Sequence, residues 1–518
     1  MRYILITILI TIITYEIPSQ EDLFLSETTE SARRFAIQKL SSELDALLLS
    51  NDLKNTKISV AVYSIDYQEY YYQKNYNLPL TPASLTKLFT TYTALYLLGK
   101  DYKLRTSIYI DGEIKDSILN GNLYIYGRGD ALFSVDDLKN VVNKIYEKGI
   151  RGINGNIVAD GSYFDTITNR LEYSNDNDIV EPIPKITALS LERNTIGLII
   201  NGQNDKGNAT IFTIPASENI SIVNNINILS EVNNSYDASS KRNDISLEIK
   251  NNFGDSQFKK RKRQTVRVNS LLLKNGNQIF VCKGFIKRNK QLYFSYFAEN
   301  PLLVIAGSLK KYLEYKGIRV RGDGIIGNVP RAILSKPDFV KFERPLLELI
   351  YYANKKSDNY IAENLFKIIG AYLGKNMTIA EQSKKIQKLI FQNSGIDCQN
   401  CLLNDGSGLS RNNLVTTKSI IQLLFKSQLL PFDDIFYQSL PIAGIDGTLE
   451  KRMKNSKAEY NISAKTGTLK NVSGLAGFAT TLQGEFLAFA IIFNGPYVYN
   501  YKIYEDKIAN LLASFSYN

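Results

Sequence analysis

Apolar residues recur every three or four positions in the first and last parts of this chain, which is the spacing of a helix with one buried face. In residues 27–50, for example, Leu40, Leu44 and Leu48 fall on one side. The same period predicts helices over seven segments: 27–50, 84–98, 343–356, 360–374, 379–395, 416–427 and 501–514. The chain therefore begins and ends with helix-rich sequence.

The middle of the chain alternates apolar and polar residues in short segments separated by Gly, Asn and Asp. This pattern predicts mostly β structure from 101 to 339, interrupted by helices at 135–149 and 300–317. Gly317 is suited to end the second of these helices. Paired strands are also expected outside the region, at 57–66 with 69–76 and at 472–482 with 485–495.

These patterns predict an α+β fold in which one domain is split by a long insertion. The catalytic domain is expected to comprise residues 20–100 and 340–518, and the insertion residues 101–339. An inner subdomain, rich in Asn and Lys, is expected at about 201–295. A domain accepts such an insertion at an exposed loop, and 518 residues suit two or three domains.

The N-terminus favours export. Arg2 precedes an apolar run at 3–15, which has the length of a signal-peptide core and is too short to span a bilayer as a helix. Residues 1–19 are therefore predicted to be a signal peptide or an N-terminal tether, and the protein is expected to be periplasmic. Membrane association is expected to be peripheral or through the tether at most. The alternative is a buried N-terminal strand or helix.

Net charge and cysteine content exclude few classes of protein. The net charge of +11 suits nucleic acid, anionic lipid or an anionic wall polymer equally. The basic run 259–263 is interpreted as a solvated loop rather than a binding patch. Cys398 and Cys401 are close enough in sequence for a small disulfide, with Cys282 left over. A zinc site normally needs four Cys or His ligands, and this chain has no His, so no metal is implied.

The lack of histidine also excludes a Ser-His-Asp triad, so a serine nucleophile would need a lysine or carboxylate base. Ser84 and Lys87 are three residues apart on a predicted helix, which places both side chains on one face. The match is weak alone, because Ser256/Lys259 and Ser308/Lys311 show the same spacing.

Two later motifs give the pair its context. Ser357 and Asn359 belong to an S-D-N turn, and Lys465 begins a K-T-G-T segment. S-x-x-K, S-x-N and K-T-G in this order are the set described for penicillin-binding proteins and serine β-lactamases. An S-D-N turn is also a plausible helix N-cap without chemistry.

The motifs, with about 270 residues between Lys87 and Ser357, resemble the DacB-type class C low-molecular-mass penicillin-binding proteins. Further similar blocks are KKSDNYIAENLFKIIG, NDGSGLSRNNL, LPIAGIDGTLEKR, SAKTGTLKNVSGLAGF and INGNIVADGSYF. The resemblance covers essentially the whole mature chain. It implies a transpeptidase-like domain, with an antiparallel sheet between helices, and an insertion of two smaller domains.

The resemblance also implies roles for the motif residues. Ser84 is the expected nucleophile and Lys87 its base, made less basic by burial and by Lys465. Ser357 is expected to pass a proton to the departing amine, and Asn359 to orient the substrate amide. The expected oxyanion hole uses the backbone N–H groups of Ser84 and Thr468. The segment that follows Lys465 is expected to hold the substrate carboxylate together with that lysine. It consists of Thr466, Gly467 and Thr468.

Three further positions match a pocket for the diamino acid of the stem peptide in that family. They are Asp160, Arg411 and Leu469. An acid and an arginine suit a zwitterionic side-chain end. A turn aspartate and a structural ion pair are equally consistent with the sequence.

The expected function is therefore a serine D-alanyl-D-alanine carboxypeptidase and endopeptidase acting on peptidoglycan stem peptides. β-Lactams are expected as covalent inhibitors, and neither a cofactor nor nucleic acid is expected as a partner. A serine β-lactamase is the nearest alternative, against which the long insertion argues. A catalytically silent wall-binding protein is the alternative from another class.

Overall fold

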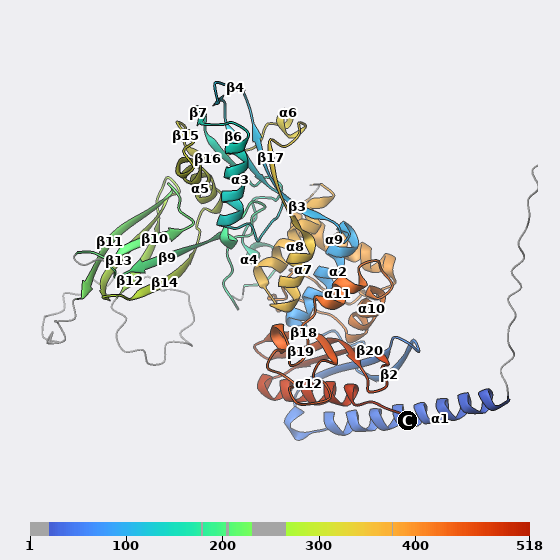
Figure 1. Cartoon of the computed structure of the whole chain (residues 1–518). Coiled ribbons are helices and arrows are strands. Elements are labelled where there is room, and N and C mark those ends of the chain that lie inside the picture. Colours follow the sequence, from blue (N-terminus) through green and yellow to red (C-terminus); the bar gives the residue numbers. More distant parts are fainter. Residues whose placement is uncertain (1–19, 178–179, 204–206, 230–265, 375–376, 518) are drawn as a thin grey trace, which may run out of the picture.

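The computed structural model describes residues 20–177, 180–203, 207–229, 266–374 and 377–517, with side chains described from residue 30 onward (Figure 1). The apolar run at 3–15 and the basic run at 259–263 lie outside these residues. Within the described part, no helix combines the length and the apolar character needed to cross a bilayer.

An antiparallel five-stranded sheet organises the part of the molecule built from both ends of the chain. In spatial order its strands are β18 (Ile462–Leu469), β19 (Val472–Thr480), β20 (Phe486–Asn494), β1 (Lys57–Ser64) and β2 (Glu69–Lys74). The predicted hairpin of β1 with β2 and the predicted pair of β19 with β20 are both confirmed.

Helices cover both faces of this sheet, which explains why β20 is apolar at almost every position. Along β20, Ala490 and Ile492 pack with the helices of one face, whereas Phe489 and Ile491 pack with those of the other. The first face carries α2 (Thr86–Leu98), α7 (Leu346–Lys355), α8 (Asn359–Tyr372), α9 (Ile379–Ser394) and α10 (Thr417–Ser427). The second carries α1 (Gln20–Leu48) and α12 (Val498–Ala513). The predicted α+β class is thereby confirmed.

The insertion begins with a second five-stranded sheet, which β17 joins from beyond the predicted boundary at 339. Its order is β16 (Gly324–Ile326), β8 (Ile157–Asp160), β6 (Leu123–Gly127), β3 (Lys103–Ile110) and β17 (Val340–Pro345). A smaller sheet has the order β15 (Arg319–Val320), β7 (Gly152–Ile153), β5 (Ile118–Asn120) and β4 (Glu113–Lys115). Helices α3 (Val135–Glu147) and α5 (Pro301–Tyr315) pack on this core, as predicted.

Two three-stranded sheets form the inner part of the insertion, drawn in green on the left of Figure 1, and Val304 of α5 packs into their core. One consists of β10 (Thr210–Ile214), β9 (Thr195–Asn201) and β14 (Gln291–Phe297). The other consists of β11 (Ile220–Leu229), β13 (Gln278–Lys287) and β12 (Arg267–Leu272). Cys282 is buried between them as a free thiol, and Cys398 and Cys401 form the small disulfide that their spacing allows.

Several short helices escaped prediction because a single turn has no apolar period to read. They are η1 (Asn51–Leu53), η2 (Ala83–Leu85), α4 (Arg170–Tyr173), η3 (Glu192–Asn194), α6 (Arg331–Leu334), α11 (Asp433–Gln438) and η4 (Gly447–Leu449). The helix predicted to start at Ser84 is one of these cases. It begins as the 3-10 turn η2, and α2 follows from Thr86.

Candidate active site

Ser84 lies in the 3-10 turn η2, which packs tightly between two glycines. A Cβ on Gly467 of β18 would lie 2.7 Å from the Pro82 carbonyl oxygen. A Cβ on Gly408 would lie 1.9 Å from the Ala83 carbonyl oxygen, and Gly408 also has a φ of +85°. Both positions therefore require glycine for the turn to approach its neighbours. Gly467 thus fixes the serine turn against the strand that carries Lys465.

Lys87 extends from the first turn of α2 and is fully buried. Its Nζ lies 2.9 Å from Ser84 Oγ, 2.7 Å from Asn359 Oδ1 and 2.6 Å from the Ser407 carbonyl oxygen. A neutral amine has two N–H groups and one lone pair. Because the amide and carbonyl oxygens can only accept, they take both N–H groups and leave the lone pair for the Ser84 hydroxyl. This arrangement suits Lys87 to remove the serine proton.

Burial lowers the pKa of Lys87 to about 8, although the nearby Asp405 and Glu363 carboxylates favour its charged form. The pKa of Lys465 is well below its usual range, first because of burial and second because of the charge on Lys87. Repulsion between the two ammonium groups is mutual, so the pair loses one proton readily. Burial thus lowers the pKa of Lys87, whereas burial and the charge of the neighbouring lysine together lower the pKa of Lys465.

Ser357 occupies the turn before α8 with a φ of +55°, a conformation that non-glycine residues adopt at a cost. This turn aims its hydroxyl at the lysine of β18, since Lys465 Nζ donates to Ser357 Oγ at 2.8 Å. The N-cap of α8 is Asp358, whose side chain accepts from the Ile361 N–H at 3.0 Å. Asp358 is therefore the residue that caps the helix, and the Ser357 hydroxyl is directed toward the site.

Asn359 bridges two parts of the chain. Its Oδ1 accepts from Lys87, and its Nδ2 donates to Glu181 Oε2 at 2.6 Å. Glu181 belongs to the insertion and was not predicted, because no motif surrounds it. The position of Glu181 depends on how the insertion folds back over the site, and the sequence pattern does not show this.

A pocket of about 450 Å³ opens above these groups. Lining it are the predicted residues Ser84, Ser357, Asn359, Thr466, Thr468 and Leu469. Arg452 and Thr448 line it too and were missed, although both lie in the block LPIAGIDGTLEKR. Thr448 Oγ1 is 2.8 Å from Thr466 Oγ1. The pocket therefore joins a serine and its buried lysine to a hydroxyl-rich, cationic wall.

Two of the three weaker predictions lie outside this pocket wall. Asp160 is fully buried at the end of β8, where its carboxylate accepts from the Val329 and Ser162 N–H groups at 2.6 and 2.7 Å. As placed, its carboxylate stabilises a turn and does not line the pocket, so its role in substrate binding stays a prediction. The Arg411 guanidinium donates to the Lys470 carbonyl oxygen at 3.0 Å and does not line the pocket.

A buried network holds the loop behind Lys87. Glu363 accepts from the Ser407 N–H and from the Tyr173 hydroxyl, both at 2.8 Å. Asp405 accepts from the Gly408 and Ser410 N–H groups and pairs with Arg170 of the insertion at 3.1 Å. These contacts fix the Ser407 carbonyl that faces Lys87. The NDGSGL segment is thus a support for the site.

Comparisons with known proteins agree with this geometry. The chain is 27% identical over 500 residues to the D-alanyl-D-alanine carboxypeptidase of an Actinomadura species, covering 93% of this chain and 85% of the relative. It is 27% identical over 421 residues to D-alanyl-D-alanine carboxypeptidase DacB of Haemophilus influenzae, covering 80% of each. The crystal structure of penicillin binding protein 4 (dacB) from H. influenzae has the same fold, with a TM-score of 0.69, 24% identity, and coverage of 91% of this chain and 99% of that one.

The profile of one family spans nearly all of the described sequence, matching residues 40–254 and 251–514. The chain belongs to the D-Ala-D-Ala carboxypeptidase 3 (S13) family.

Proposed function

We propose that this protein is a periplasmic serine DD-peptidase that cleaves D-Ala-D-Ala ends, and D-Ala-diamino acid cross-links, of peptidoglycan stem peptides. The catalytic unit comprises residues 20–100 with the C-terminal part of the chain, and residues 101–345 form the insertion. The observation that carries the proposal is the set of three contacts at Lys87 Nζ, which leaves its lone pair for Ser84.

Acylation begins when Ser84 Oγ attacks the carbonyl carbon of the penultimate D-Ala and its proton passes to Lys87 Nζ. The developing oxyanion is placed near the backbone N–H groups of Ser84 and Thr468. β18 is the edge strand of its sheet, and beyond Ala464, whose N–H donates to the Pro441 carbonyl oxygen, its outer side is open to pair with an extended peptide. Each backbone N–H of the oxyanion hole contributes on the order of 10²- to 10³-fold to the rate.

Departure of the terminal residue requires a proton on its nitrogen. Ser357 Oγ lies next to Lys465 Nζ at 2.8 Å, so the proton reaches the amine through this hydroxyl. Lys465, Thr466 and Thr468 hold the terminal carboxylate. Water then attacks the acyl carbonyl: its OH is added to the released acid, and its remaining proton restores the Ser84 hydroxyl through Lys87. A β-lactam carbonyl is attacked by Ser84 in the same way, which makes β-lactams covalent inhibitors.

Labelling with a fluorescent penicillin tests the nucleophile. The native chain should form a stable adduct, and Ser84→Ala should form none. Ser308→Ala is the matched control, because Ser308 has the same S-x-x-K spacing but is buried in α5. Lys87→Ala should slow acylation by about 10²- to 10⁴-fold, as expected on removal of a general base. Absence of an adduct on folded native protein would refute the proposal, and rapid turnover of the penicillin would favour a β-lactamase.

Digestion of pentapeptide muropeptides separates the two peptidase activities. Release of D-Ala indicates the carboxypeptidase activity, and conversion of cross-linked dimers to monomers indicates the endopeptidase activity. If neither product forms while the folded protein still binds wall material, the chain is a silent binding protein instead.

A further inference from the structure

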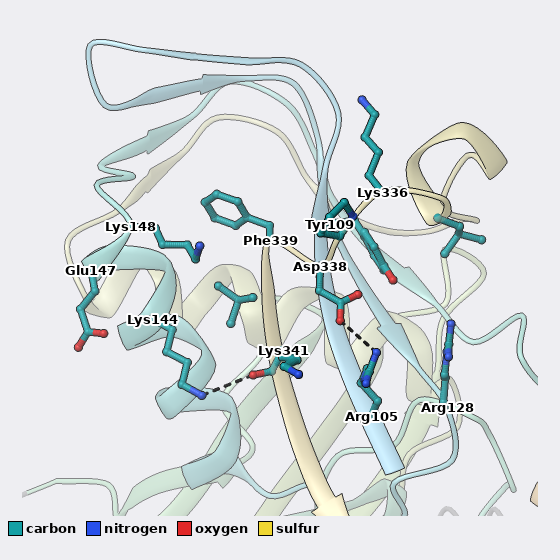
Figure 2. Close-up of a pocket in the computed structure, with 13 residues that line it drawn as sticks. Arg105, Tyr109, Arg128, Lys144, Glu147, Lys148, Lys336, Asp338, Phe339 and Lys341 are labelled. Atoms are coloured by element: carbon teal, nitrogen blue, oxygen red, sulfur yellow. Dashed lines mark hydrogen bonds and ion pairs between the residues drawn. The ribbon is translucent and has the colours of Figure 1, made fainter. Parts of the chain in front are cut away.

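A second hollow, of about 720 Å³, lies in the insertion and is lined by none of the residues of the active-site pocket. We call it the basic groove, formed by residues of β3 and β17, the C-terminal end of α3, Arg128, and the loop 334–339 (Figure 2). Its volume is within the range of pockets that hold small ligands, roughly 300 to 1,000 Å³. It is therefore large enough for a chemical group of a polymer.

Cations outnumber anions around this groove. Its basic residues are Arg105, Arg128, Lys144, Lys148, Lys336 and Lys341, against the carboxylates Glu147 and Asp338. Asp338 is already paired with Arg105 at 3.6 Å, and Glu147 points away from the hollow in Figure 2. Within the described part of the chain, Arg128, Lys144, Lys148 and Lys336 have no carboxylate within 4.0 Å. The groove consequently presents several uncompensated positive charges on one concave surface.

Arg128 gives an independent indication of a ligand. Its Nε is buried, and no described residue accepts a hydrogen bond from it. Its guanidinium lies over the Tyr126 ring, 5.6 Å from the centroid. The unpaired Nε is costly, and a carboxylate or phosphate oxygen bound at the half-buried guanidinium would compensate the arginine charge. The planar fork of an arginine suits such two-oxygen groups.

Lys148 extends into the same space, with its Nζ 5.0 Å from the centroid of the Phe339 ring. Lys144 Nζ donates to the Lys341 carbonyl oxygen at 3.4 Å, so α3 and β17 close one side of the groove. Lys144 of α3 and Lys148, which follows it, therefore face Arg105 of β3 and Arg128 across the hollow. This spacing suits a ligand with more than one anionic group.

We propose that the basic groove is an accessory site that binds carboxylate or phosphate groups of the cell-wall polymer, apart from the bond that Ser84 attacks. This inference rests on the proposed function for the choice of polymer. β17 runs from the groove directly into α7, which ends just before Ser357. One strand and one helix thus connect the anchoring site to the catalytic turn.

Co-sedimentation with purified insoluble cell wall tests the proposal. Lys144→Gln/Lys148→Gln removes two exposed groove charges, and Arg128→Gln separately removes the buried donor. The matched control, Lys115→Gln/Lys283→Gln, removes two exposed charges from β4 and β13 of the insertion. The groove variants should bind wall about fivefold to tenfold more weakly, as expected for a few partly exposed ionic contacts. The control should bind as the wild type does, and all variants should label with penicillin normally.

Competition identifies the anionic group. A polyphosphate or a poly-glutamate of matched length should displace the wild type from wall, and whichever competes better identifies phosphate or carboxylate as the ligand. Wild-type binding should weaken with salt more than that of the groove variants. Equal wall binding by wild type and both groove variants would overturn the proposal. So would displacement by phosphatidylglycerol vesicles or DNA alone. Sedimentation needs no acylation. A failure of penicillin labelling would therefore refute the peptidase function, whereas wall binding by the groove would still be tested by sedimentation.

Discussion

At the scale of single residues, the chemistry depends on how many protons two buried lysines hold. Lys87 and Lys465 are both fully buried, and the Nζ of each lies within 3 Å of a serine hydroxyl of the site. A pKa of about 8 leaves roughly a tenth of Lys87 neutral at pH 7. Only the neutral fraction can take the Ser84 proton.

The rate of penicillin acylation should therefore rise with pH. Between pH 7 and pH 9 the neutral fraction of a group with a pKa of about 8 grows roughly tenfold, and the second-order rate constant should follow it. Stopped-flow measurement of acylation across this range checks the prediction, with protein stability monitored in parallel. A rate that is flat or falls with pH would mean that Lys87 acts in its charged form.

The sequence could predict the residues that carry this chemistry because their motifs are local. S-x-x-K and K-T-G each place their groups within one turn or strand segment, and their order in the chain is readable. Glu181 and the Ser407 carbonyl could not be predicted, since they reach the site through tertiary packing. The bonds of the Asp160 carboxylate to two backbone N–H groups could not be predicted either, because they depend on how the chain turns after β8.

At the scale of elements, the turn before α8 combines a helix cap with a site residue. Apolar periodicity could predict α9 and α10 because each packs one face on the core, and it could predict α8 although that helix is buried on all sides. It could not predict that α2 begins as a 3-10 turn, since that geometry depends on the contacts of Gly408 and Gly467 with residues 82 and 83. The elements beside Ser84 are thus shaped by packing more than by propensity.

Removing the cap of α8 should affect both stability and acylation. Asp358→Ala removes the bond to the Ile361 N–H and should lower the free energy of unfolding by about 1 kcal/mol. Thr378→Ala removes the equivalent cap of α9, away from the pocket, and should cost a similar amount. Thermal denaturation and penicillin labelling of both variants check this. Only Asp358→Ala should label more slowly, and equal labelling would show that the cap does not position Ser357.

At the scale of the whole molecule, the insertion contributes buried contacts to the catalytic unit. Arg170 and Tyr173 of α4 reach Asp405 and Glu363, and Lys367 of α8 pairs with Asp165 at 2.8 Å. Burial and the charge of Asp405 raise the pKa of Glu363. Arg170 compensates this concentration of negative charge, so the insertion is part of the support for the catalytic loop.

Arg170→Ala should consequently destabilise the molecule far more than loss of a surface pair. It leaves the Asp405 charge buried without its cation, which costs about 3 to 5 kcal/mol. Lys418→Ala breaks the exposed pair with Asp397 and should cost at most about 1 kcal/mol. Urea denaturation measures both changes. Because Asp405 holds the backbone around Ser407, Arg170→Ala should also slow penicillin acylation at temperatures where the protein is still folded. A variant that is destabilised but acylates at the native rate would show that the insertion supports the fold without positioning Lys87.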